Sequence, residues 1–292
     1  MNIAIALGGG GARGMAHIGV LRRLEQEGFQ VRVVAGTSAG GIIAALYASG
    51  QTPDQMEAAF AEVDQSKLFA RASQEGPGLL GLSGAEAVLK KFLGERTFAD
   101  LRMPCAMAAT DIRSGREVVL REGRVLDAVM ATIAVPGVFP PKEYGDIQLV
   151  DGAVVDPVPV SLARQLAPAL PVVAVVLSPL VQPTTSPGVL PLPLTVPGPI
   201  MERLTRTRIA QAFGIFVSAV DAGGHMITEL RLQVDRPDVI IRPAVGDIGL
   251  LDKVDIHKVV RLGEKAADAA LPELKRAVSW PSRLRRRVMQ RR

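Results

Sequence analysis

The sequence has one cysteine and three histidines among its 292 residues, and a long stretch of it lacks charge. The single cysteine, Cys105, excludes an intrachain disulfide and is compatible with a reducing cytosol. The first residues, MNIAIAL, lack the basic region and the long apolar region of a signal peptide. Residues 165–201 carry no charge, but nine prolines in this run argue against a membrane-spanning helix. We therefore expect a cytoplasmic protein.

Excess positive charge is confined to the end of the chain. The net charge is +5, but residues 283–292 (RLRRRVMQRR) hold six arginines and no acid, so the remainder carries −1. A nucleic-acid groove needs basic residues spread over a folded face, so no nucleic-acid partner is expected. A basic tail suits an anionic membrane surface, and the apolar, proline-rich loop at 178–200 would add shallow insertion. These segments predict transient contact at the inner membrane face; the alternative is a solvated, frayed terminus.

Apolar runs and helical patterns alternate along the chain. Strands are predicted at 2–7, 31–35, 104–112, 116–121, 147–150, 171–177 and 239–242. Helices are predicted at 15–27, 41–49, from Thr52 onward, at 83–93 with a capping box from Ser83, at 124–133, 201–220 and 254–270, with a short helix beginning at His225. This alternation predicts an α/β fold, a three-layer α/β/α arrangement with a mainly parallel central sheet. We expect one domain over residues 1–272 and a tail over 273–292.

The segment VVAGTSAGG has the form strand, G-x-S-x-G, helix, and its serine is Ser38. A serine on a sharp strand-to-helix turn projects its hydroxyl above the sheet edge. Gly36 and Gly40 flank it at positions where a Cβ would collide with crowded backbone. The following helix N-terminus favours developing negative charge. The pattern therefore favours a nucleophilic serine, and the alternative is a helix N-cap serine between two turn glycines.

A second glycine-rich segment, GGGGARG at 8–14, also follows a strand and opens a helix. Gly9, Gly11 and Gly14 satisfy G-x-G-x-x-G, but the acid that would hold a ribose is missing after the second strand, and no Gly-Lys-Ser/Thr follows. Consecutive glycines also turn backbone N–H groups toward one point, as in an oxyanion hole. Neighbouring strand ends would place this loop beside Ser38, with Arg13 holding the loop or meeting an anionic headgroup.

A serine nucleophile needs a base, and the three histidines are poorly placed for it. His17 and His257 lie in predicted helices, and His225 begins a short one. Asp151, in LVDGA, follows a short apolar strand, and Gly152 allows a tight turn that aims the carboxylate. A carboxylate accepts a serine proton when partial burial raises its pKa. The alternative is an ordinary Asp–Gly turn.

The three motifs, in this order, resemble the patatin-like phospholipase family, in particular its short bacterial members. The stretches ATIAVPGVFPP (131–141) and DGAVVDPVP (151–159) add to the resemblance. It implies a Ser–Asp dyad without histidine, in which Ser38 matches the nucleophile and Asp151 the base. It also implies acyl esters of lipids as substrates, with no metal or other cofactor.

The resemblance further assigns the glycine loop. Gly10 and Gly11 match the oxyanion donors, and Arg13 matches the family's basic loop position. Asp156 departs from the family pattern, which has Asn there, and this residue is expected to order the turn after Asp151. Two other readings remain: a histidine-using esterase of the α/β-hydrolase type, and a catalytically silent lipid-binding or regulatory protein.

Overall fold

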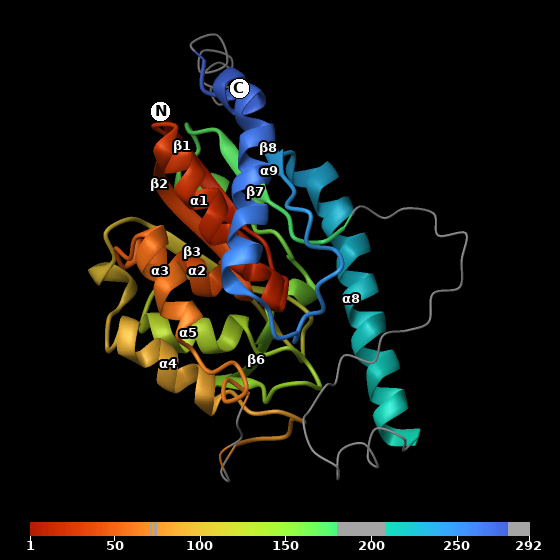
Figure 1. The fold of residues 1–292 in the computed structure, drawn as a ribbon. Helices are drawn as coiled ribbons and strands as arrows, with labels where there is room; N and C mark the ends of the chain where they lie inside the picture. Colours follow the sequence, from red (N-terminus) through yellow and green to blue (C-terminus); the bar gives the residue numbers. More distant parts are fainter. Residues whose placement is uncertain (70–71, 73–74, 180–207, 280–292) are drawn as a thin grey trace.

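A mixed sheet organises the part of the chain that the computed structural model describes, residues 1–69, 72, 75–179 and 208–279 (Figure 1). Its strands are β1 (Asn2–Leu7), β2 (Gln30–Thr37), β3 (Cys105–Asp111), β4 (Glu117–Leu120), β5 (Lys142–Tyr144), β6 (Ile147–Asp151), β7 (Val172–Val175) and β8 (Val239–Ile241). They follow the order β5-β6-β3-β2-β1-β7-β8, and β4 pairs with β3 off this path. The central pairs β3-β2, β2-β1, β1-β7 and β7-β8 are parallel, whereas β4, β5 and β6 join antiparallel.

Helices cover both faces of this sheet. They are α1 (Ala16–Gln26), α2 (Ala39–Ala48), α3 (Pro53–Ala61), α4 (Ser83–Leu93), α5 (Val125–Thr132), α6 (Val160–Leu166), α8 (Arg208–Asp235) and α9 (Ile256–Ala277), with the 3₁₀ helices η1 (Gly11–Met15), η2 (Phe98–Asp100) and η3 (Gly152–Val154). Ile3 and Ile5 of β1 pack into one core with residues of α1, α2, α5 and α9, while Ala4 and Ala6 pack with α6 on the other face. The predicted three-layer, mainly parallel α/β fold is confirmed.

The register of the two central strands brings both glycine-containing turns to one sheet edge. Leu7 at the end of β1 lies opposite Gly36 of β2. Because the strands are parallel, the loop after β1 and the turn after β2 leave the sheet at its carboxyl edge. Ligand sites of open α/β sheets lie at this edge.

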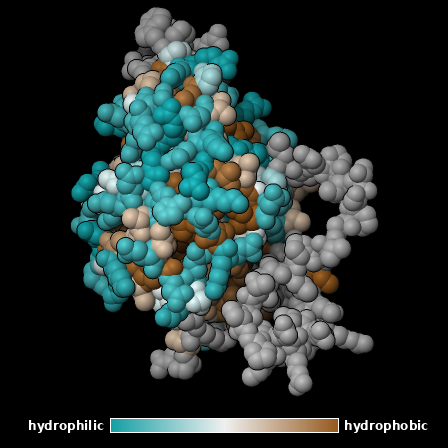
Figure 2. All heavy atoms as spheres, viewed as in Figure 1, coloured by the Kyte–Doolittle hydropathy of each residue, from teal (hydrophilic) through white to brown (hydrophobic). Residues whose placement is uncertain are grey.

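Helix α9 packs on α1, which follows the glycine loop. Gly19 and Gly263 stand where the helices cross, and a Cβ added at either would lie 1.9 Å from a carbonyl oxygen of the other helix. Lys275 pairs with Glu27 at 2.9 Å across the same contact. Hydrophilic side chains cover most of the face that these helices present (Figure 2). This packing fixes the helix that continues the glycine loop.

The N-terminus of α3 is capped as the sequence indicates, whereas that of α4 is capped differently. For α3, Thr52 forms a capping box with Gln55, as its sequence indicates. The predicted capping box at Ser83 is wrong, because Leu82 occupies the N-cap position and Ser83 is already helical. The carboxylate of Glu75 accepts hydrogen bonds from the amides of Leu82 and Ser83 instead, at 3.0 and 2.8 Å. A carboxylate from outside the helix thus satisfies the amides of the N-cap residue and of the first helical residue.

The C-terminal helices are longer than predicted. From Arg208 onward, the helix expected at 201–220 and the short helix expected from His225 are one helix, α8, which continues through glycines 223 and 224; residues 201–207 of the first prediction lie outside the described residues. Each glycine disfavours the helix by about 1 kcal/mol, and burial of Thr228 and Leu232 against the body offsets this. Helix α9 likewise runs past the predicted end at 270 and contains Pro272, so it crosses the expected domain boundary. Helix α6 and strand β5 were not predicted.

The two segments expected to contact a membrane lie outside the described residues, apart from 178–179 of the proline-rich loop. Helices within the described ranges were all too short or too polar to span a bilayer.

Candidate active site

Ser38 occupies the sharp turn between β2 and α2. Its backbone has φ 53° and ψ −124°, a conformation that non-glycine residues rarely adopt. The flanking residues must be glycines because any side chain would clash with the backbone. A Cβ at Gly36 would lie 2.4 Å from the Gly40 carbonyl oxygen, and one at Gly40 would lie 2.1 Å from the Leu7 carbonyl oxygen. The turn therefore stores strain at the serine, as expected for a residue presented for chemistry.

Thr132, at the end of α5, supports this strained turn. Its hydroxyl oxygen accepts a hydrogen bond from the Ser38 amide at 2.9 Å, and the hydroxyl donates to the Ala108 carbonyl at 2.5 Å. All three groups are buried. Sequence analysis did not identify Thr132; its one signal is a polar residue at the end of the apolar last turn of α5.

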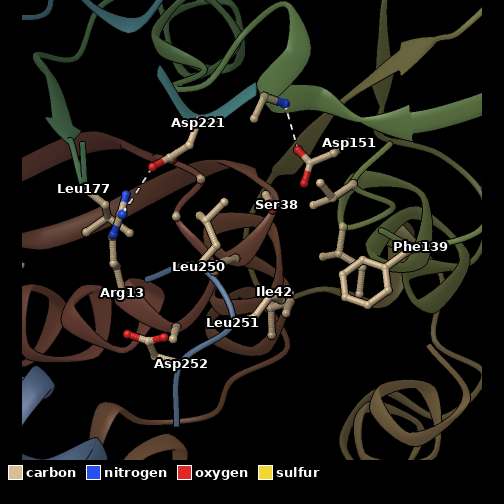
Figure 3. Close-up of a pocket in the computed structure, with 18 of the residues that line it drawn as sticks. Arg13, Ser38, Ile42, Phe139, Asp151, Leu177, Asp221, Leu250, Leu251 and Asp252 are labelled. Atoms are coloured by element: carbon tan, nitrogen blue, oxygen red, sulfur yellow. Dashed lines mark hydrogen bonds and ion pairs between the residues drawn. The ribbon is translucent and has the colours of Figure 1, made fainter. Parts of the chain in front are cut away.

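Asp151 ends β6 and points toward Ser38 (Figure 3). Its Oδ1 atom accepts a hydrogen bond from the Ala153 amide at 2.8 Å. Burial raises the pKa of Asp151 to about 6, although the Ser38 hydroxyl and the Ala153 amide oppose the shift by hydrogen bonding to the carboxylate. A Cβ at Gly152 would lie 2.3 Å from the Ala108 carbonyl oxygen, so the turn needs glycine there.

The glycine loop lies alongside the serine turn. A Cβ built on Gly9 would be 3.2 Å from the Ser38 Cβ, and one on Gly14 would be 2.6 Å from the Ala39 Cβ. Gly11 has φ 56°, and a Cβ there would come within 2.0 Å of the Leu250 carbonyl oxygen. The loop is thus pressed between the serine turn and the segment before α9, with no room for side chains.

Two backbone amides of this loop are available to a ligand. The Gly9 amide donates to the Pro157 carbonyl at 2.9 Å. The amides of Gly10 and Gly11 have no acceptor within the described part of the chain, and both residues line the cavity that contains Ser38. Unpaired N–H groups beside a serine hydroxyl are suited to an oxyanion.

Arg13 holds the loop in place. Its side chain is buried; Nε donates to the Ile248 carbonyl at 2.5 Å, and Nη2 lies 3.4 Å from Asp221 Oδ2 of α8 (Figure 3). Asp221 Oδ1 in turn lies 3.5 Å from His225 Nε2. Of the two roles considered for Arg13, these contacts favour holding the loop over meeting a headgroup.

His17 and His257 contact groups other than Ser38. His17 is fully buried, and its Nε2 lies 2.8 Å from the Gly8 carbonyl oxygen. Burial lowers the pKa of His17 to about 4, so the ring is neutral and Nε2 carries the donated proton. His257 is exposed and lies 2.6 Å from Glu57. Among the hydrogen bonds of the described residues, none joins a histidine to Ser38.

Ser38, Asp151 and the glycine loop open onto a cavity of about 740 Å³. Its walls are mainly apolar and include Ile42, Phe60, Phe69, Leu80, Leu89 and Phe139. This size and lining suit an apolar ligand with a polar group held at the serine. Within the described ranges, no three His, Cys, Asp or Glu side chains gather as metal ligands do.

Comparison with protein families gives one match over more than half of the chain. Residues 5–164 match the model of the patatin-like phospholipase family. The chain belongs to that family. The predicted resemblance is therefore confirmed.

Curated relatives of this patatin-like protein include two uncharacterized NTE family proteins of Mycobacterium tuberculosis. One is 33% identical over 162 residues, covering 54% of this chain and 44% of the relative; the other is 29% identical over 285 residues, covering 92% and 46%. A patatin-like phospholipase domain-containing protein of Caenorhabditis elegans is 35% identical over 177 residues, covering 56% of this chain and 13% of the relative. The chain thus spans less than half the length of these relatives.

The fold is also found among solved structures. The crystal structure of VipD from Legionella pneumophila aligns with a TM-score of 0.50 at 11% identity, covering 93% of this chain and 66% of VipD. At this identity the likeness concerns the fold alone. The family match ends at residue 164, so β7, α8, β8 and α9 of this patatin-like chain lie beyond it.

Proposed function

We propose that the protein is a lipid acyl hydrolase of the phospholipase A or esterase type. It cleaves carboxylic ester bonds with a Ser38–Asp151 dyad and an oxyanion hole of the Gly10 and Gly11 amides. The observation that carries this proposal is the strained serine turn facing a buried carboxylate with a pKa raised to about 6. Family membership supports it, because the family is one of phospholipase-like proteins.

The first half-reaction follows from these groups. At neutral pH the Asp151 carboxylate is ionised and accepts the Ser38 proton as Oγ attacks the ester carbonyl carbon. The tetrahedral oxyanion accepts hydrogen bonds from the Gly10 and Gly11 amides. When the C–O bond to the leaving alcohol breaks, Asp151 returns the proton to that oxygen, and the acyl group remains on the serine.

The second half-reaction uses the same groups with water. Water gives a proton to Asp151 and attacks the acyl carbon, and the oxyanion again binds at the loop amides. Collapse releases the carboxylic acid, and the proton on Asp151 returns to Ser38 Oγ. The buried, neutral His17 and the exposed His257 do not enter this sequence. His225 lines the cavity, but its Nε2 atom lies 3.5 Å from Asp221 and no hydrogen bond of the described residues joins it to Ser38, which favours a dyad over a histidine-dependent triad.

The apolar cavity supports a lipid acyl chain as the part of the substrate next to the serine. Such a substrate is held in an aggregate, so we propose that the protein acts peripherally at an anionic membrane surface, on its cytoplasmic side. The six arginines of 283–292 support this part of the proposal by charge.

Labelling with a fluorophosphonate, followed by hydrolysis assays, tests the proposal. Wild-type protein should be labelled at Ser38 and should release fatty acid from phospholipid or from a soluble nitrophenyl ester. Ser38→Ala should fold, remain unlabelled and lose nearly all hydrolysis. Ser114→Ala, in the exposed β3–β4 turn, is the matched control and should behave as wild type. Substantial hydrolysis by folded Ser38→Ala would refute the assignment.

A further inference from the structure

Asp156 is a fully buried carboxylate in the loop that follows the proposed base. Its Oδ2 atom lies 2.9 Å from Arg231 Nη2 of α8. Apart from this ion pair, the two carboxylate oxygens have no partner among the described residues. A buried charge is costly unless it is paired. The charge of Asp156 therefore depends on Arg231, which lies 75 residues further along the chain.

The backbone around Asp156 connects all three parts of the proposed active site. Its amide donates to the Gly152 carbonyl at 2.8 Å, within the turn after the proposed base. Its carbonyl accepts from the Thr37 hydroxyl at 2.9 Å, one residue before the nucleophile. The next carbonyl, of Pro157, accepts from the Gly9 amide at 2.9 Å. A shift of residues 156–157 would therefore disturb the base, the nucleophile turn and the glycine loop together.

Arg231 faces three carboxylates and is the cation that joins them. Besides Asp156, its Nε lies 3.3 Å from Asp235 Oδ2, and its Nη2 lies 3.8 Å from Glu117 Oε2. Nη2 also lies 3.5 Å from the Ser161 hydroxyl, to which it donates. Burial raises the pKa of Asp156 and the two neighbouring acids add to this, while Arg231 opposes it. Without the guanidinium, three like charges would face one another at a buried position.

We infer that Arg231 is a positioning residue for catalysis: its ion pair with Asp156 holds residues 151–157 in the register that aligns base, nucleophile and oxyanion loop. Arg231 does not touch the reacting atoms. The inference rests on the proposed function, since it assumes that these three parts act on one ester. It assigns a role to α8, which lies outside the range matched by the family.

The test is a double-substitution cycle with Arg231→Gln, Asp156→Asn and the two combined. With a soluble nitrophenyl ester, Arg231→Gln should lower kcat by about 10-fold to 100-fold, the usual effect of a small misplacement, with KM changed less than about twofold. The double variant should recover most of the lost kcat, because it leaves no charge at 156 to compensate. Arg236→Gln, an exposed arginine just beyond α8, is the control and should match wild type.

The pH dependence separates positioning by charge from a general structural loss. In Arg231→Gln, ionisation of Asp156 leaves an uncompensated buried charge, so the ratio of its kcat to that of wild type should fall as pH rises. Its unfolding free energy should fall relative to wild type in the same direction, because the folded-state pKa of Asp156 is then raised further. The double variant lacks Asp156, so the fall in relative kcat with rising pH that its ionisation causes in Arg231→Gln should be absent.

Two results would overturn the inference: a folded Arg231→Gln with kcat within about twofold of wild type, or a double variant as slow as Arg231→Gln. If Arg231→Gln does not fold, Arg231→Lys and the double variant test the positioning role instead. Both should fold, and the kcat of each should exceed 10% of the wild-type value, in line with the tenfold scale above. Slower turnover in both would also overturn it. A wild type without Ser38-dependent hydrolysis would instead refute the proposed function, and the positioning role with it.

Discussion

Replacing Asp151 by asparagine should slow catalysis and stabilise the protein at the same time. The substitution keeps an oxygen for the Ala153 amide but removes the carboxylate that we propose accepts the Ser38 proton. We expect kcat to fall by a factor on the order of 10² or more, the usual range for a lost general base. In wild type, the acid limb of kcat/KM should have its midpoint near pH 6, because only the ionised carboxylate acts as base. The residual rate of Asp151→Asn should lack this limb.

The stability effect follows from the same pKa. Raising a carboxyl pKa from 3.8 to about 6 disfavours its charged form in the folded protein by about 3 kcal/mol. Below about pH 4, Asp151 is protonated in both states and contributes nothing to the pH dependence. As pH rises to about 6, the unfolded chain ionises first, so the stability of wild type falls, and the full cost persists at higher pH. Asp151→Asn should therefore be more stable than wild type by up to about 3 kcal/mol at pH 8, and by little at pH 4.

Urea denaturation at several pH values and initial-rate measurements on one preparation test both effects. Asp146→Asn, an exposed acid in the β5–β6 turn, is the control and should change neither quantity. The reasoning would be refuted if Asp151→Asn kept more than half of wild-type kcat. It would also be refuted if the stability difference between wild type and variant did not grow from pH 4 to pH 8.

Three further predictions concern the surroundings of the dyad. Gly11→Ala, whose Cβ would meet the Leu250 carbonyl, should lower kcat more than it raises KM; an effect on KM alone would make the loop a substrate clamp. Thr132→Val leaves the buried Ser38 amide without its acceptor and should cost about 1–3 kcal/mol by thermal unfolding, whereas Thr132→Ser should retain stability. Deleting 283–292 should reduce binding to anionic vesicles and its salt sensitivity without changing hydrolysis of a soluble ester; equal binding at low and moderate salt would contradict this.

The sequence predicts those parts of the site that depend on short, local sequence patterns. The serine turn is a strand, two glycines and a helix within one short segment, and steric contact explains each glycine. The glycine loop and the turn at Asp151 are equally local. Parallel pairing of β1 with β2, which follows from the alternation of strands and helices, then predicts that loop and serine are neighbours.

The parts that the sequence does not predict depend on pairing between distant segments. Arg231 and Asp156 meet because α8 packs against residues 151–157, and no periodicity in either segment indicates this contact. Thr132 reaches the serine turn only because α5 ends beside it. The predicted break of α8 before His225 fails for a related reason, since tertiary packing holds the helix together through two glycines that local propensity disfavours.

The residues of the proposed chemistry and several residues that hold them in place come from two different regions of the chain. All of the proposed chemistry lies within residues 5–164, the range that matches the family. The partners of Arg13, the ion pair of Asp156 and the cavity wall at Leu250 and Leu251 come from residues after 164. The apolar wall at Ile42, Phe60, Phe69, Leu80, Leu89 and Phe139 comes from the earlier residues, so both regions shape the cavity, and the later region also holds the loops. Relatives that share mainly the first region therefore share the groups of the proposed reaction and part of the cavity wall, but not the later residues that hold the loops.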